Sequence, residues 1–163
     1  MNEIERTTTI ELFAGSSFSG KPVRERLRVH QVDTQVYRLL QSPGLVLGIA
    51  KGDLIEAPDK TGIFQIVSRA GLICVQILLQ RPVFNLAPLE TAVETELQGS
   101  VDGLTDKQLV LSVPSTAGFK KIENFLDQLV KHLGGAEWFY GNIYDPADGV
   151  TSLNWWQEYP TSD

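Results

Sequence analysis

The chain has 163 residues, of which 42% are hydrophobic and 21% are charged. These shares are those of a folded domain and exclude a disordered chain. No apolar run approaches the roughly 18 residues that span a bilayer, and the first residues lack the basic and apolar regions of a signal peptide. Because Cys74 is the single cysteine, an internal disulfide is excluded, and we expect a cytoplasmic protein that contacts no membrane.

The formal net charge of −6 is distributed unevenly along the chain. Residues 1–80 carry nine Lys or Arg and eight Asp or Glu, whereas residues 81–163 carry five and twelve. An acidic half repels nucleic-acid phosphates and favours a basic partner, so we expect no nucleic acid to bind. Solubility alone is the simpler explanation of this charge, and a basic protein partner is the alternative.

The first half of the chain predicts a series of short strands. Alternating or β-branched runs, separated by loops rich in Gly, Pro, Ser and Asp, predict strands at 7–13, 23–30, 36–40, 63–67 and 72–79. The segment 45–57 is interpreted as a tight connection into a strand, in which Gly52 adopts a positive φ and Asp53 bonds the local backbone. Strands of this length and spacing predict a small β-barrel or a strongly bent sheet.

The second half predicts alternating strands and helices. A helix capped by Asn85 extends to Gly99, followed by a strand at 109–113, a helix at 116–134 and a strand at 137–144. Counted from residue 72, this is a strand–helix–strand–helix–strand layer, and the predicted fold class is α+β. We expect a mainly β subdomain at 1–80 and an α/β subdomain at 81–163, meeting near 81–88, or one compact domain.

The helix at 116–134 has the clearest pattern in the chain. Its apolar residues recur at steps of three and four, which predicts one face packed against a sheet. We expect Ser115 or Thr116 to cap its first turn and Gly134 with Gly135 to end it. The residues of the apolar face are Phe119, Ile122, Leu126, Leu129 and Leu133.

Three short motifs carry a resemblance to a known family. They are the strand entry Gly48-Ile49-Ala50-Lys51-Gly52-Asp53-Leu54, the turn Val67-Ser68-Arg69-Ala70-Gly71, and Leu111-Ser112-Val113-Pro114 before a helix. Together they resemble an uncharacterised bacterial family of small soluble domains of unknown function, over roughly residues 25–140. The resemblance implies a bacterial protein with a barrel part followed by an α/β part. It supplies no activity that could be transferred.

No arrangement of catalytic or metal-binding residues stands out. Two histidines and one thiol inside an apolar run do not have the spacing of a zinc site, so we expect no metal and no cofactor. The alternative to a purely binding role is a small-molecule-binding protein or hydrolase with a cleft between the two subdomains. His30, Asp53 and Arg69 are the candidate residues of that cleft.

Aromatic residues crowd into residues 138–159, including all three tryptophans, and acidic residues lie among them. Trp and Tyr are enriched at protein interfaces, although the tail could equally fold back to close the core. We therefore expect a non-enzymatic protein-binding module, such as an inhibitor or immunity protein for a basic partner, with a homodimer as a further possibility. The predicted contact residues are Tyr144, Asp145, Asp148, Trp155, Trp156 and Glu158.

Overall fold

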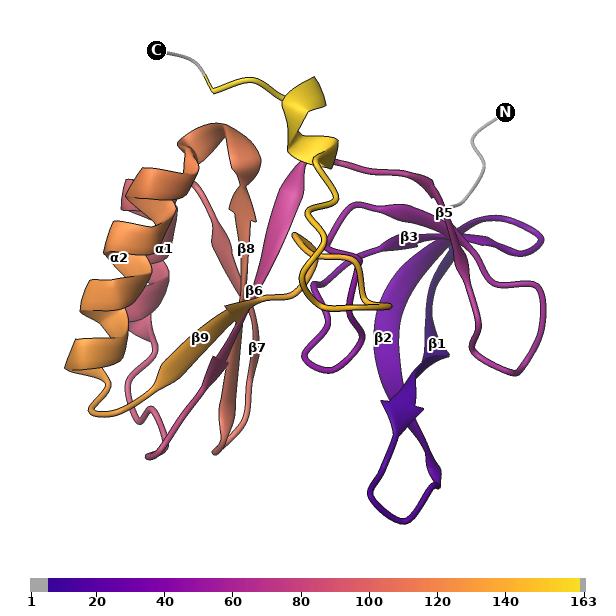
Figure 1. Ribbon diagram of the computed structural model, residues 1–163, viewed down its shortest axis with the longest axis horizontal. Helices are drawn as coiled ribbons and strands as arrows, with labels where there is room; N and C mark the ends of the chain where they lie inside the picture. The colour runs from indigo at the N-terminus through magenta and orange to yellow at the C-terminus, as the bar shows by residue number, and fades with distance from the viewer. Residues whose placement is uncertain (1–5, 162–163) are drawn as a thin grey trace.

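Two antiparallel sheets lie side by side, and two helices cover the outer face of one of them (Figure 1). The computed structural model describes residues 6–161. Within these residues nine β-strands and two α-helices are present, together with two short 3₁₀ turns. No helix among them is long and apolar enough to cross a membrane.

The first sheet has five strands that follow one another in sequence order. Its inward side chains, such as Leu12, Leu27 and Ile55, are fully buried, while their neighbours in sequence face water, as a period of two requires. A backbone hydrogen bond from Phe13 N to Gly62 O (3.0 Å) links its two ends, but among the described residues no ladder closes the sheet. The predicted barrel is therefore wrong, and the sheet is open. The strands are β1 (Arg6–Ser16), β2 (Pro22–Asp33), β3 (Val36–Leu39), β4 (Leu54–Glu56) and β5 (Gln65–Ser68).

The second sheet has the strand order β7-β8-β6-β9, and both helices connect its strands. The chain order is β6, α1, β7, β8, α2, β9, which is the split βαβ arrangement of ferredoxin-like domains. The broad α+β prediction is confirmed. The elements are β6 (Leu72–Leu78), α1 (Ala87–Leu97), β7 (Ser100–Leu104), β8 (Gln108–Pro114), α2 (Phe119–His132) and β9 (Glu137–Tyr140).

Two features of the second sheet differ from the prediction. The strand β7 was not expected, because its Asp102-Gly103 pair is typical of a turn. It is an edge strand with a register shift between Val101 and Gly103, so the glycine lies at an irregularity rather than at a turn. In addition, the chain passes from the first sheet to the second between Ser68 and Leu72, before the expected junction at 81–88.

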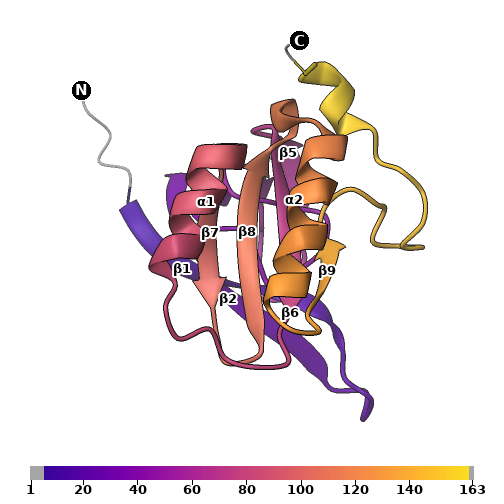
Figure 2. The ribbon, with the colours of Figure 1, turned by 90° about the vertical axis from the view of Figure 1, so that its left-hand side faces the viewer.

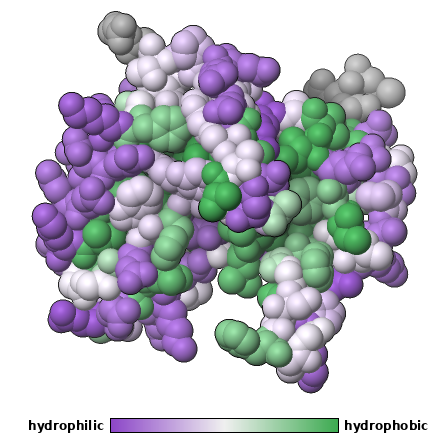
Figure 3. All heavy atoms as spheres, in the orientation of Figure 1, coloured by the Kyte–Doolittle hydropathy of each residue, from purple (hydrophilic) through white to green (hydrophobic). Residues whose placement is uncertain are grey.

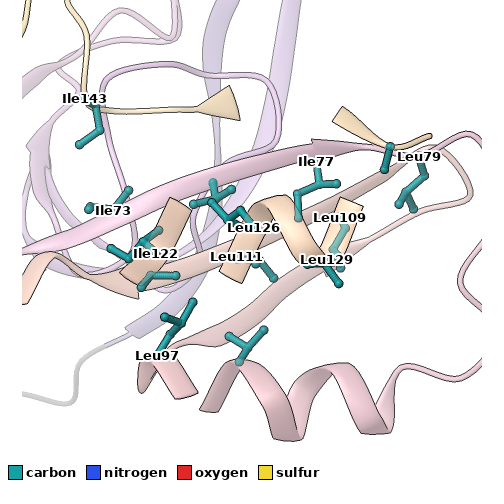
Figure 4. Packing of buried hydrophobic residues seen from close by; sticks show 14 residues of the cluster. Ile73, Ile77, Leu79, Leu97, Leu109, Leu111, Ile122, Leu126, Leu129 and Ile143 are labelled. Atoms are coloured by element: carbon teal, nitrogen blue, oxygen red, sulfur yellow. The ribbon is translucent and has the colours of Figure 1, made fainter. Parts of the chain in front are cut away.

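Both helices pack on the same face of the second sheet, as Figure 2 shows. Alternate residues of β6 and β8 meet Ile122, Leu126 and Leu129 of α2 to form the larger core of the molecule (Figure 4). Burying one such side chain stabilises the fold by about 1.5–3 kcal/mol before the entropy cost of ordering it. The predicted apolar face of α2 is therefore confirmed. The sheet residues of this core are Ile73, Val75, Ile77, Leu109, Leu111 and Val113.

The helix ends show where local sequence signals were misleading. α2 begins later than expected because a 3₁₀ turn (Ser115–Ala117) precedes it, and Gly118 is its N-cap, with no side-chain cap. Leu86, not Asn85, is the N-cap of α1. Both predicted capping interactions are therefore wrong. The predicted end of α2 is confirmed, since Gly134 follows Leu133 with φ +68°.

Candidate binding site at the seam between the sheets

The segment 41–53 connects β3 to β4 and crosses the seam, which is the junction of the two sheets. It packs on the back face of the second sheet, the face turned away from α1 and α2. Ser42 Oγ lies 2.6 Å from Ser112 Oγ of β8, and Ser42 N donates to Asp102 Oδ2 of β7 at 2.7 Å. Ser112 Oγ donates to the same carboxylate, so this buried polar cluster satisfies its own donors.

The next residues of this segment are held from both sides. Pro43 O accepts hydrogen bonds from Gln76 Nε2 at 3.1 Å and from the Cys74 thiol at 3.3 Å. From the first sheet, the Glu25 carboxylate accepts the backbone N–H groups of residues 44–46 at 2.7–2.9 Å. Backbone donors fixed on a carboxylate form charge-assisted hydrogen bonds, so this loop is rigidly positioned.

Cys74 is fully buried, as the apolar run around it predicts. Burial raises the pKa of its thiol well above the ordinary range. It therefore stays protonated and acts as a core residue rather than a nucleophile.

The rigid loop leaves two leucines half exposed beside the second sheet. Gln108 Nε2 donates to Gly44 O at 2.6 Å and Gln108 pairs with Leu78 in the ladder, so Leu45 lies beside Leu78. Gly48 N donates to Gly141 O at 2.8 Å, which brings Leu47 to the end of β9. We call the exposed apolar side chains gathered here the seam patch; they are Leu45 (52% exposed), Leu47 (45%), Leu78 (46%) and Phe139 (48%).

The space-filling view places hydrophobic side chains on the face where the two halves of the molecule meet (Figure 3). Monomeric proteins seldom hold several large apolar side chains together in water without a binding role. A loop fixed by hydrogen bonds cannot fold these leucines inward. The seam patch is therefore a preformed apolar surface.

Carboxylates border the seam patch. Glu137 pairs with Leu78 across the β6–β9 ladder and shares its face. The loop after β9 lies against Gly48, where an added Cβ would come within 2.9 Å of Pro146 Cγ, and it carries Asp145 and Asp148. Hydrogen bonds from Thr151 and Val150 lower the pKa of Asp148, so this group is ionised at neutral pH. Carboxylates thus lie on the side of the patch that β9 and the following loop form.

The predicted contact residues divide into two groups. Tyr144, Asp148 and Glu158 are exposed, and Asp145 is half-buried at the start of its turn, where Asp145 O accepts Gly149 N at 2.7 Å. The two tryptophans of the tail lie in the 3₁₀ turn η2 (Trp155–Glu158) and are only half exposed.

Both tryptophans are engaged with the body of the protein. Trp155 Nε1 donates to Asn142 O at 2.8 Å, and its ring lies under the Arg69 guanidinium at 5.5 Å. Trp156 makes an edge-to-face contact with Phe119 at 5.2 Å. These rings help to hold the tail on the molecule, and a partner contact through them remains a prediction.

Two of the three candidate cleft residues come together at the seam. Arg69 Nη1 lies 3.7 Å from Asp53 Oδ2 and donates to Gly48 O at 2.9 Å. Asp53 is only 1% exposed, and its carboxylate accepts the N–H groups of Ala50 and Ala70, both at 3.0 Å. This carboxylate is therefore a sealed structural group rather than part of an open site.

Burial raises the pKa of Asp53 to about 6, against the lowering effect of its two backbone donors and of Arg69. Burial of the Arg69 guanidinium lowers the pKa of Arg69, whereas the negative charge of Asp53 raises it. His30 does not join this pair. It lies on β2, where its ladder partners are Thr7 on β1 and Arg38 on β3. Asp53 directly precedes β4, and β3 lies between β2 and β4 in the sheet.

The helical face carries hollows of about 490 Å³ and 390 Å³ between α1 and α2. Glu96, Phe125 and Gln128 line both hollows, and no predicted site residue lines either. Among the described residues, no group of three or more His, Cys, Asp or Glu side chains could hold a metal ion.

The sequence did not reveal the seam patch. Leu78 lies near the end of an apolar run and Leu45 lies in a run of small and apolar residues, so both resemble core residues. Their exposure follows from the contact of segment 41–53 with the second sheet, which lies far away in sequence. Only Phe139 gives a local signal, because it alternates with Trp138 and Tyr140 and therefore lies on the opposite face of the strand.

Comparison with known proteins shows a family and a fold. A solved structure titled "Novel crystal structure of a hypothetical protein from Neisseria gonorrhoeae" is similar, with a TM-score of 0.62 and 13% identity over 86% of this chain and 96% of that chain. No curated protein matches the sequence. The family model "Domain of unknown function (DUF4265)" matches residues 25–138, more than half of the chain. The chain therefore belongs to the DUF4265 family of domains of unknown function.

Proposed function

We propose that this chain is a non-enzymatic bacterial protein of the cytoplasm that binds a basic protein partner on the seam patch. An inhibitor or immunity protein is one concrete form of this function. The observation that carries the proposal is the seam patch itself. Four large apolar side chains lie half exposed there, two on a loop fixed by hydrogen bonds and two on the strands β6 and β9, and carboxylates border them.

The physical basis is the usual arrangement of a protein interface. Binding energy concentrates in apolar side chains at the centre, while charges at the border select the partner and accelerate association. Here Leu47 and Phe139 would form the centre, and Glu137 and Asp148 the border. A carboxylate border repels acidic proteins and attracts lysine and arginine, which supports a basic partner.

The alternative, a small-molecule-binding protein or hydrolase, has less support. It needs Asp53 and Arg69 to face an open cleft together with His30. The Asp53 carboxylate is buried and accepts two backbone N–H groups. The Arg69 guanidinium donates to Gly48 O and stacks on the Trp155 ring. We therefore retain the binding role alone.

The partner can be identified with a photo-crosslinking amino acid placed at Leu47, in cells of the organism that encodes the chain. The same amino acid at Thr95, an exposed residue of α1 on the far side of the second sheet, is the matched control. The expected result is a basic protein that crosslinks from position 47 and not from position 95.

The affinity of the purified partner then tests the proposal. Leu47→Ala and Phe139→Ala should each weaken binding about tenfold, which is roughly 1.4 kcal/mol, because truncation removes apolar contact at the centre of an interface. Thr95→Ala should leave the affinity unchanged. Calorimetric titration measures all three. Equal affinities for the wild type and both patch variants would contradict the proposed function.

A further inference from the structure

β9 is an edge strand that borders the seam patch. It pairs with β6 on one side and is the last strand of the second sheet, and Figure 2 shows it at the margin of that sheet. Phe139, a member of the seam patch, lies in this strand. An unpaired strand edge offers a row of backbone donors and acceptors that can accept a further strand.

The ladder indicates which backbone groups of β9 are available. Gly141 N donates to Cys74 O at 2.8 Å, so the N–H of residue 141 points to β6. In an antiparallel pair, successive residues alternate between pointing to the partner and away from it. Phe139 therefore points its backbone groups to β6, whereas Trp138 and Tyr140 point theirs to the open side. Within residues 6–161, no backbone hydrogen bond joins Trp138 or Tyr140 to a segment on that side.

The side chains along this edge differ between its two faces. On the back face Phe139 is exposed and apolar. On the helix face, Asp127 accepts a hydrogen bond from Trp138 Nε1 at 2.9 Å, and Glu123 accepts one from Tyr140 Oη at 2.7 Å. An added strand would thus meet an apolar ring on one face and carboxylates on the other.

We propose that β9 accepts a β-strand from the partner, and that this strand alternates apolar and basic residues. The inference rests on the proposed function and specifies its binding mode. Apolar side chains of the added strand would contact Phe139 on the back face, while lysine or arginine would approach Asp127 and Glu123 on the helix face. The backbone groups of Trp138 and Tyr140 would supply the new ladder.

Charge disfavours a second copy of this chain as the occupant. Pairing of two β9 strands would bring the acidic border of each copy, including Glu137 and Asp127, to one interface. Like charges brought together there repel, whereas a basic strand neutralises them.

Amide hydrogen exchange followed by NMR tests the inference with a defined probe. The probe is a short synthetic peptide of alternating lysine and valine, and its counterpart with glutamate in place of lysine is the control. At saturating lysine peptide, exchange of the Trp138 and Tyr140 amides should slow by about tenfold or more. The Phe139 and Gly141 amides should be protected with and without the peptide, and the glutamate peptide should cause no change.

A variant separates charge from packing. Asp127→Asn keeps an oxygen that can accept from Trp138 Nε1 but loses the charge, and should weaken binding of the lysine peptide about threefold. Asp106→Asn, an exposed carboxylate outside this edge, should have no effect.

Two results would overturn the inference. One is the absence of new protection at Trp138 and Tyr140, whether or not the peptide binds. The other is equal binding of the lysine and glutamate peptides. If the cellular partner still depends on Leu47 and Phe139 while these two amides exchange rapidly in its complex, strand addition fails and the proposed function stands. If Leu47→Ala and Phe139→Ala leave the partner's affinity unchanged, the proposed function itself fails.

Discussion

At the scale of single residues, Asp53 is a carboxylic acid held almost wholly out of water at the seam. Two backbone N–H groups and Arg69 favour its ionised form, but desolvation is the larger effect, and the pKa rises from 3.8 to about 6. Between these two values the folded state binds more protons than the unfolded state. The contribution of Asp53 to stability is therefore fully present below pH 3.8 and is lost as the pH rises through about 6.

Asp53→Asn should remove this pH dependence. The difference in free energy of unfolding between wild type and variant should be larger at pH 4 than at pH 7, by up to about 3 kcal/mol, because about two pKa units separate the folded and unfolded states. Urea unfolding of both proteins at the two pH values measures this difference. The contributions of the other titrating groups are common to both proteins and cancel. A difference that is constant, or that grows with pH, would contradict the prediction.

The Glu25 carboxylate has a different role, because it holds a loop in place. It accepts hydrogen bonds from the three backbone N–H groups of residues 44–46. Glu25→Ala should lower the free energy of unfolding by about 2–3 kcal/mol, because these donors lose a charged acceptor. Chemical denaturation measures the change. Glu11→Ala, which removes an exposed ion pair with Arg26, is the control and should cost less than about 1 kcal/mol. Equal effects of the two substitutions would show that Glu25 does not hold the loop.

At the scale of elements, periodicity predicted most of the strands and both helices, because each of these elements buries one face. The steps of three and four in α2 and the apolar run of β6 are local in sequence and sufficient on their own. The start of α2 was missed because a 3₁₀ turn and Gly118 replace the expected serine or threonine cap, and that of α1 because Leu86 and not Asn85 is the N-cap. β7 was missed because its Asp102-Gly103 pair is typical of a turn, and local patterns do not reveal its ladder with β8.

The candidate site was less predictable, because it depends on contacts between segments that are distant in sequence. The sequence identified Asp53 and Arg69, which do meet, but assigned them to a cleft rather than to a sealed pair. It identified an acidic, aromatic region around Tyr144 and Asp148, which borders the seam patch. The leucines of the patch were missed, because exposure depends on what remains uncovered after two distant segments have packed.

At the scale of the whole molecule, the question is whether the two sheets fold as one unit. The first sheet has a small core of its own, in which seven apolar residues are buried within the described part of the chain, and small cores support limited stability. It is tied to the second sheet by buried hydrogen bonds from Ser42 and by Arg69, whose carbonyl accepts the Tyr159 hydroxyl at 2.7 Å. These links favour one cooperative domain over two independent subdomains at 1–80 and 81–163.

Two optical probes can test this cooperativity, since all three tryptophans lie after residue 80. Tryptophan fluorescence therefore reports on the second sheet and its tail, whereas far-ultraviolet circular dichroism reports on both sheets. In urea the two signals should give a single shared midpoint, as two-state unfolding requires. Asp102→Ala, which removes the acceptor of Ser42 N and of Ser112 Oγ, should lower the free energy of unfolding by about 2–4 kcal/mol and shift both signals together. If the first sheet unfolded alone, circular dichroism would change at lower urea than fluorescence. The seam would then be a contact between two separate domains, and the loop at residues 44–46 could not hold the seam patch in place.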